Sequence, residues 1–154
     1  LTLEAWIDYV LSRFHEGHRR DLPSLLERTR SLESAQADHP ACPTGLAAHL
    51  ARTAEELELH MQKEEQVLFP MLRAGRGRMA MMPITMMREE HEEHGRNLAR
   101  LRELASGFVV PSDAPPSAAD DWKTLYADLA ALVDEVSLHV QCENEIVFAR
   151  AVSV

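Results

Sequence analysis

The sequence is poor in the residues that build sheets, disulfide frameworks and nucleic-acid surfaces. Aromatic residues make up only 5% of its 154 residues, and there are six glycines and few β-branched runs, which favours helices over sheet. Two cysteines, Cys42 and Cys142, are too few for a disulfide framework. The formal net charge is −9, whereas a nucleic-acid surface needs a basic face. These shortages favour a helical protein that does not bind nucleic acid.

Long apolar runs are also missing. No run approaches the length that spans a membrane, and no signal peptide is visible. We therefore expect a soluble protein of a reducing compartment, the cytoplasm, with no membrane partner. The length suits one domain with a sizeable core, which we expect to cover residues 1–154. The chain begins at Leu1 rather than at a methionine, so the sequence leaves open whether a preceding region was removed.

Helical periodicity is what the sequence has in abundance. Apolar residues recur at alternating spacings of three and four in four segments, which cover about 2–34, 43–74, 79–106 and 117 to near the end. The stretches "DHPACPTG", "GRGR" and "GFVVPSDAPPSA" separate them and are rich in helix-ending residues. Four long amphipathic segments with short connections predict an all-α fold, an antiparallel up-down four-helix bundle.

Two of the apolar seams contain a histidine and a glutamate. In the second segment the predicted seam is Leu46, Leu50, Thr53, Leu57, His60, Glu64, Val67 and Met71. In the fourth it is Leu125, Leu129, Leu132, Val136, His139, Glu143 and Ile146. A glutamate in a bundle core is costly unless its charge is matched, and neutral histidine alone does not match it. The seams therefore point to a bound cation.

The two pairs are parts of one repeated motif, "HMQKEEQVLFP" at 60–70 and "HVQCENEIVFA" at 139–149. A spacing of four residues puts imidazole and carboxylate on one side of a helix, one turn apart. There they can grip one cation, and a carboxylate can bridge two. One such motif is weak evidence, because both residues are common on exposed helices; two copies on two seams are much stronger.

The other two helices offer histidines at the same height. Counted from the helix ends that meet at one pole of an up-down bundle, His15, His60, His91 and His139 all lie roughly 18–22 Å from that pole. Four inward histidines and two inward glutamates suit a pair of first-row metal ions with bridging carboxylates, above all iron.

With these residues in place, the chain resembles the hemerythrin-like di-iron domains, and more narrowly the bacterial repair-of-iron-centres proteins of the nitric oxide stress response. The resemblance covers essentially the whole chain. It rests on "RFHEGHRRDLP", "HMQKEEQVLFPML", "MMREEHEEHG", "DDWKTLYADL" and "HVQCENEIVFARA". It implies the metal ligands His15, His60, Glu64, His91, His139 and Glu143. It also implies two non-haem iron ions, joined by an oxo or hydroxo bridge and by the carboxylates of Glu64 and Glu143.

The resemblance implies iron–sulfur cluster repair: reaction with nitric oxide, donation of iron to damaged clusters of iron–sulfur proteins, or both. The alternative is an oxygen- or NO-binding or sensing module, or an iron store, without turnover. Two ferrous ions have the electrons to couple two NO molecules to nitrous oxide, but no residue pattern establishes a proton route or an electron donor, so an enzymatic role stays open. The repair family usually carries a short cysteine-containing domain before the di-iron domain. We expect none in residues 1–154.

The third helix separates the chain from the oxygen-carrying hemerythrins, in which that helix offers two histidines four residues apart. Here Gly95 stands four residues after His91, and the fourth helix offers Glu143 four residues after its histidine. Each iron would then have two histidines, which makes oxygen carriage less favoured than a labile or NO-reactive site.

Several residues near the layer are open to two interpretations. His18 and His94 each follow a predicted ligand by three residues, and we expect outer-layer or partly exposed histidines rather than ligands. Glu56 and Glu90 are solvated surface residues, or else carboxylates on an iron path or partners that orient a ligand histidine. His39 is predicted to be a loop or capping residue and His49 structural. Cys142 and the methionines of the third segment are predicted to fill core space, the latter being Met79, Met81, Met82, Met86 and Met87.

Overall fold

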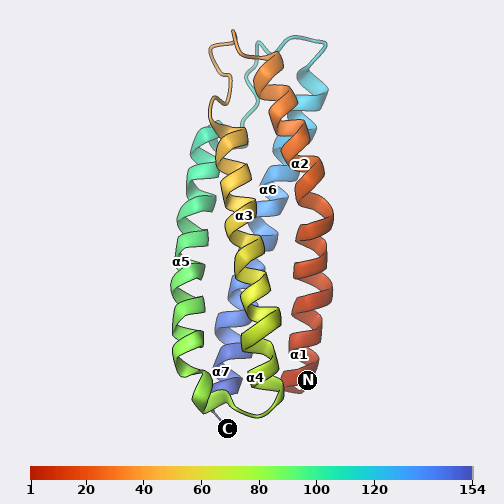
Figure 1. Cartoon of the computed structure of the whole chain (residues 1–154). Helices are drawn as coiled ribbons and strands as arrows, with labels where there is room; N and C mark the ends of the chain where they lie inside the picture. The colour runs from red at the N-terminus through yellow and green to blue at the C-terminus, as the bar shows by residue number, and fades with distance from the viewer. Residues whose placement is uncertain (154) are drawn as a thin grey trace.

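Four long helical rods run side by side along the molecule (Figure 1). The computed structural model describes residues 1–153. The first rod consists of α1 (Leu3–Tyr9), a π-helical segment (Val10–His15) and α2 (Glu16–Ala35). The second consists of α3 (Leu46–Lys63), a π-helical segment (Glu64–Leu68) and α4 (Phe69–Arg73). A 3₁₀ turn (Gly77–Ala80) and α5 (Met81–Leu104) form the third. The fourth consists of α6 (Ala119–Cys142), a π-helical segment (Glu143–Val147) and α7 (Phe148–Val152).

The rods alternate in direction, and both chain ends lie at the pole where α4 turns into the third rod (Figure 1). There is no strand among the described residues. The predicted all-α, antiparallel up-down four-helix bundle is confirmed, with helix ends within a few residues of those expected. None of the helices in residues 1–153 combines the length and apolarity needed to cross a membrane.

Local contacts fix where the rods begin and how they meet. Thr2 caps α1 by accepting a hydrogen bond from the backbone N–H of Ala5 at 3.1 Å. At the pole, Gly77 passes so close to α7 that an added Cβ would lie 1.8 Å from the carbonyl oxygen of Ala151. Only glycine permits this approach, which holds the turn before α5 against the last helix.

Two apolar clusters fill the bundle, one on each side of a polar layer. The larger contains Leu50, Leu57 and Trp122 and extends toward the end that carries the long loops; the smaller contains Phe14 and Phe148 and lies toward the pole with the termini. The histidines of the layer are buried between them. The layer is therefore held from both sides by packed side chains.

The seam of the second rod differs from the predicted one beyond the layer. Val67 was expected inside but is 53% exposed, and Leu68 is buried instead; in the next turn Leu72 is buried where Met71 was expected. The reason is the π-helical segment that begins at Glu64. Its wider turn holds one extra residue, so every buried position after it moves one place along the chain.

The fourth rod repeats this shift. Its π-helical segment begins at Glu143, and the fully buried residue is Val147, whereas Ile146 is only half-buried. Both wide turns begin at the glutamate of the repeated motif. In both motifs the change of helix geometry therefore coincides with the pair of polar side chains.

The prediction that the methionines of the third rod fill the core is wrong for four of the five. Met87 is buried, but the others are between 50% and 76% exposed: Met79, Met81, Met82 and Met86. They lie in the turn at the pole and on the outer face of the first turns of α5, where no other rod covers them.

Candidate metal centre

The six residues predicted as metal ligands lie together on the inner faces of the four rods. They are His15, His60, Glu64, His91, His139 and Glu143. Each is at most 3% exposed. The structure brings all six into one layer, and their role as ligands stays a prediction.

The layer contains two overlapping groups. The first consists of His15, His139, Glu64 and Glu143, and each residue has one potential ligand atom within 4.8 Å of those of the other three. Nε2 of His15 lies 3.2 Å from a carboxylate oxygen of Glu64. Nε2 of His139 lies 3.3 Å from an oxygen of Glu143. A single ion of ordinary size fits among these four atoms.

The second group contains His60 and His91 together with the same two glutamates, at the same spacing. Nε2 of His60 lies 3.4 Å from Glu64, and Nε2 of His91 lies 2.9 Å from Glu143. Both carboxylates are therefore common to the two groups, whereas each histidine belongs to one. This is the arrangement expected for two neighbouring ions with shared carboxylates.

The polar atoms of the layer fit such ions. Among residues 1–153, neither oxygen of Glu64 or Glu143 has a hydrogen-bond partner, and Nε2 of His15 and of His139 also has none. Burying an unpartnered carboxylate costs on the order of several kcal/mol. Imidazole nitrogen and carboxylate oxygen are ligands that iron and its first-row neighbours accept. The donor set matches a pair of divalent cations.

Burial and mutual contacts set the protonation of the layer. Burial raises the pKa of Glu64 well above its ordinary value, and the Glu143 carboxylate adds to the effect. Burial also opposes the charge of Glu143, but contacts with His139 and two further histidines outweigh it and hold its pKa well below the ordinary value. Burial disfavours a charged His60, yet contacts with Glu143 and Glu64 raise its pKa to about 11. His60 thus holds a proton that an incoming metal ion must displace, and the raised pKa of Glu64 makes its carboxyl group easier to protonate as well.

Each of the four histidines directs Nε2 toward the centre and Nδ1 toward a partner outside it. The pairs are His15 with Glu65 at 2.6 Å, His60 with Glu90 at 2.9 Å, His91 with Asn144 at 2.7 Å and His139 with His18 at 3.1 Å. A partner on Nδ1 fixes the ring orientation and the tautomer that leaves Nε2 free for a metal.

Of these partners, the sequence had suggested Glu90, as one of two interpretations, and His18, as an outer-layer histidine; Glu65 and Asn144 were missed. The signal is that Glu65 follows Glu64 and Asn144 follows Glu143 directly. Because successive helix residues are about 100° apart around the axis, the neighbour of an inward residue faces the adjacent helix. There its side chain contacts Nδ1 of a proposed ligand histidine, on the side of the ring that faces away from the centre.

Besides the exchange of Glu65 for Asn144, the two halves of the site differ at a second position. Glu90 precedes His91 and contacts His60, but the corresponding residue before His15 is Phe14. The Phe14 ring stacks on His139 with the ring centroids 5.0 Å apart and an interplanar angle of 3°. His139 therefore takes His18 as its partner. As a result, each metal group contains one histidine backed by a carboxylate and one backed by a neutral side chain.

His18 and His94 are both buried, so the expectation of outer-layer histidines fits them and that of partial exposure is wrong. Burial, together with neighbouring histidines, lowers the pKa of each to about 3. The His94 ring stands edge-on to His60 with centroids 4.7 Å apart. In the described part of the chain its Nε2 has no hydrogen-bond partner, because Glu90 already occupies Nδ1 of His60.

The residues expected away from the centre have structural contacts. His39 lies in the first loop, as expected, and accepts a hydrogen bond from the backbone N–H of Ala41 at 2.9 Å. His49 is buried and donates from Nε2 to the carbonyl oxygen of Asn97 at 2.8 Å. Glu56 is exposed and accepts a hydrogen bond from the side chain of Asn97. Cys142 is buried in the smaller apolar cluster, so its predicted packing role is confirmed.

The fold and the layer together define a class, the cation-binding four-helix bundle. Comparison with known families is more specific. Residues 7–151 match the model of the Hemerythrin HHE cation binding domain, and the chain belongs to this family.

Curated relatives are longer proteins of one kind. The chain is 40% identical over 147 residues to the iron–sulfur cluster repair protein YtfE of Escherichia coli O81, which covers 96% of the chain and 65% of that protein. It is 38% identical over 149 residues to the protein of the same name from Musicola paradisiaca, covering 97% of the chain and 65% of the relative. The chain therefore spans about two thirds of the length of these relatives.

Proposed function

We propose that the chain is a non-haem di-iron protein of the iron–sulfur cluster repair type, which reacts with nitric oxide, donates iron to damaged clusters, or both. One observation carries the proposal: two four-residue groups share two buried carboxylates whose oxygens lack hydrogen-bond partners among the described residues. The ligands we propose are His15, His60, Glu64, His91, His139 and Glu143. Glu64 and Glu143 would bridge two ions.

The side chains of the layer have distinct tasks in this proposal. One pair of histidines, His15 and His139, would hold one ion, and the other pair, His60 and His91, would hold the second. The partners on Nδ1 keep the imidazole rings in position. Two adjacent ferrous ions, when bound, would supply two electrons and two neighbouring positions for small ligands. The apolar clusters above and below exclude bulk water from the layer. Each histidine also has an outer partner on Nδ1, which fixes the orientation of its ring.

The relatives are named iron–sulfur cluster repair proteins, which supports the repair role and suggests iron–sulfur proteins as recipients. NO or O2 are the small ligands that we propose for the two ions. The absence of a histidine four residues after His91 on α5 supports a labile site. Gly95 takes the position four residues after His91, so each proposed ion has two imidazole ligands.

The experiment that tests the proposal has two stages. The first measures iron per chain and the near-ultraviolet spectrum of the protein purified in air and of the protein reconstituted anaerobically with ferrous ion. The second adds NO to the reduced protein and follows transfer of iron to a damaged iron–sulfur enzyme. Near two irons per chain with NO binding and iron transfer supports repair. Reversible oxygen binding without iron loss would favour a carrier or sensor, and failure to hold iron would overturn the proposal.

A further inference from the structure

The metal layer is screened from solvent by polar contacts on two neighbouring sides. Between α2 and α3, Arg19 donates hydrogen bonds to Glu58 at 2.9 Å and to Glu65 at 2.7 Å, directly behind His15. Between α3 and α5, the ammonium group of Lys63 lies 2.8 Å from Glu90 behind His60. These ion pairs close the two sides at the height of the layer.

The side between α5 and α6 is closed in the same way. Arg88 donates to the backbone carbonyl of Asn144 at 3.2 Å, and its guanidinium lies over the Phe148 ring at 5.6 Å from the centroid. The Phe148 ring in turn stacks on His91. Charged and aromatic side chains thus cover three of the four sides.

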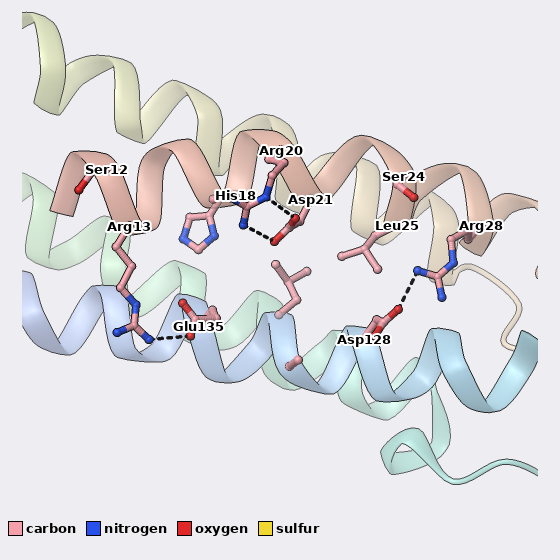
Figure 2. A pocket seen from close by; sticks show the side chains of 13 residues that line it. Ser12, Arg13, His18, Arg20, Asp21, Ser24, Leu25, Arg28, Asp128 and Glu135 are labelled. Carbon is pink, nitrogen blue, oxygen red and sulfur yellow. Dashed lines mark hydrogen bonds and ion pairs between the residues drawn. The ribbon is translucent and has the colours of Figure 1, made fainter. Parts of the chain in front are cut away.

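The fourth side, between α2 and α6, contains a groove with a volume of about 700 Å³ (Figure 2). Small side chains line its walls, among them Gly17, Ser24 and Ala131. Ion pairs cross from one helix to the other near its two ends: Arg13 with Glu135 at 2.9 Å, and Arg28 with Asp128 at 2.8 Å (Figure 2). The groove exists because the residues between these pairs are too small to fill it.

His18 links the groove to the metal layer. It lines the groove, and Figure 2 shows its ring directed from α2 toward α6. Its Nε2 lies 3.1 Å from Nδ1 of His139. One imidazole ring therefore separates the groove from a proposed ligand.

The charges around the groove balance. Three arginines and three carboxylates line it, in the pairs Arg13–Glu135, Arg20–Asp21 and Arg28–Asp128. A balanced lining neither concentrates ions of one sign nor repels them strongly. It suits a small uncharged molecule better than a metal cation or an anion.

We propose that small uncharged molecules reach the metal centre through the groove between α2 and α6, past His18. The inference rests on the proposed function, because it assigns the route to the same di-iron site. A smaller hollow of about 290 Å³ lies on the same side between α1 and α6, lined by Leu138 and Phe14. Phe14 closes that hollow, since its ring is stacked face to face on His139.

The test measures the association rate of nitric oxide with the reduced, iron-loaded protein by stopped flow, and the rate at which neutral bipyridine extracts its iron. Ala131 is exposed at the rim of the groove, so Ala131→Trp fills it without touching the layer. We expect NO association to slow by at least about tenfold and bipyridine extraction to slow as well, with iron content unchanged. His18→Ala enlarges the opening and should speed NO association. The wild-type rate should depend little on salt.

Two control substitutions on the same helix complete the test. Ala127 is exposed one turn before Ala131 and lines none of the four hollows that the structure describes, so Ala127→Trp should leave the rates unchanged. Leu138→Trp fills the smaller hollow and should also leave them unchanged. If Ala131→Trp binds two irons and still associates with NO at the wild-type rate, the route is wrong. The route is also wrong if only Leu138→Trp slows the association of NO. Absence of iron from the wild-type protein would instead overturn the di-iron function, and the route with it.

Discussion

The carboxyl groups of Glu64 and Glu143 are costly side chains to place in the core of the bundle. Both are fully buried, and neither has a hydrogen-bond partner among residues 1–153. Stability alone would select apolar residues at such positions. Their presence at the centre of a well-packed layer is therefore best explained by a cation.

Replacing either carboxylate with leucine separates this role from that of the scaffold. In Glu64→Leu we expect iron affinity to fall by more than about 100-fold, because both proposed ions lose a ligand. The metal-free variant should gain about 1–3 kcal/mol in its free energy of unfolding, because a buried unpartnered carboxyl group is removed. Metal analysis and urea unfolding measure the two effects. Glu55→Leu, on the exposed face of α3, is the control that should keep its iron.

The carboxylates behind the histidines should act on one ion each. Glu65 backs His15 in the first group, and Glu90 backs His60 in the second. Glu65→Gln and Glu90→Gln are each expected to weaken one of the two ions by about 10–100-fold and to leave the other bound. Stepwise iron titration followed by Mössbauer spectroscopy distinguishes the two sites. Equal loss of both ions in either variant would contradict this division.

Metal affinity should depend on pH through the protons of the layer. The pKa of His60 is raised to about 11 by contacts with Glu143 and Glu64, so at neutral pH its proton must leave before Nε2 binds metal. Proton loss becomes easier as the pH rises, and affinity for ferrous ion should therefore increase by at least about tenfold per unit between about pH 6 and 8. Anaerobic competition titration checks the slope. An affinity that does not change with pH would mean that no proton is displaced.

At the scale of elements, the π-helical segments give the bundle its local geometry. In two rods the wide turn starts at the glutamate of the repeated motif, and in the first rod it ends at His15. A π turn inserts one residue without breaking the helix. The inward side chains before and after it can then face the same core although their spacing no longer follows a regular α-helix.

Deleting one residue from such a turn should restore an ordinary helix. Val67 is exposed within the π segment, and its removal places Leu68 where the regular seam expects an apolar residue. We expect this variant to stay helical with a melting temperature within a few degrees of wild type, while iron affinity falls because the turn that positions Glu64 is lost. Circular dichroism and metal analysis test both parts. Deletion of the exposed Arg52 in regular α3 should instead unfold the bundle, because it rotates all later side chains by about 100°.

The sequence predicts the four rods, their directions and the six residues of the layer, because periodicity and helix rise fix which side chains share a face and a height. It does not predict the π turns, because no local residue preference distinguishes them from α turns. Val67 was therefore assigned to the buried seam although it is exposed, and Ile146 was expected at a position that is only half-buried. The exposed methionines were missed for another reason: a flexible apolar residue at a helix start is compatible with core and with surface.

At the scale of the whole molecule, the two apolar clusters should hold the bundle together without metal. They lie on opposite sides of the layer and include contributions from all four rods. Chelation should therefore leave the helix content unchanged. Ferrous ion at about 1,000 times its dissociation constant should add about 4 kcal/mol to the free energy of unfolding and raise the melting temperature by roughly 10 °C. Calorimetry with and without iron measures the shift, and a molten chain after chelation would contradict it.

The six residues of the layer are divided equally between the two halves of the chain. Residues before Gly75 supply His15, His60 and Glu64, and those after it supply the other three. In the proposed centre each ion takes one histidine and one carboxylate from each half, so neither half holds an ion by itself. A chain cut at Gly75 would yield two helical hairpins that pack through the apolar clusters and that iron would hold together more tightly, so the protein can be regarded as a metal-strengthened heterodimer that a single peptide segment makes permanent.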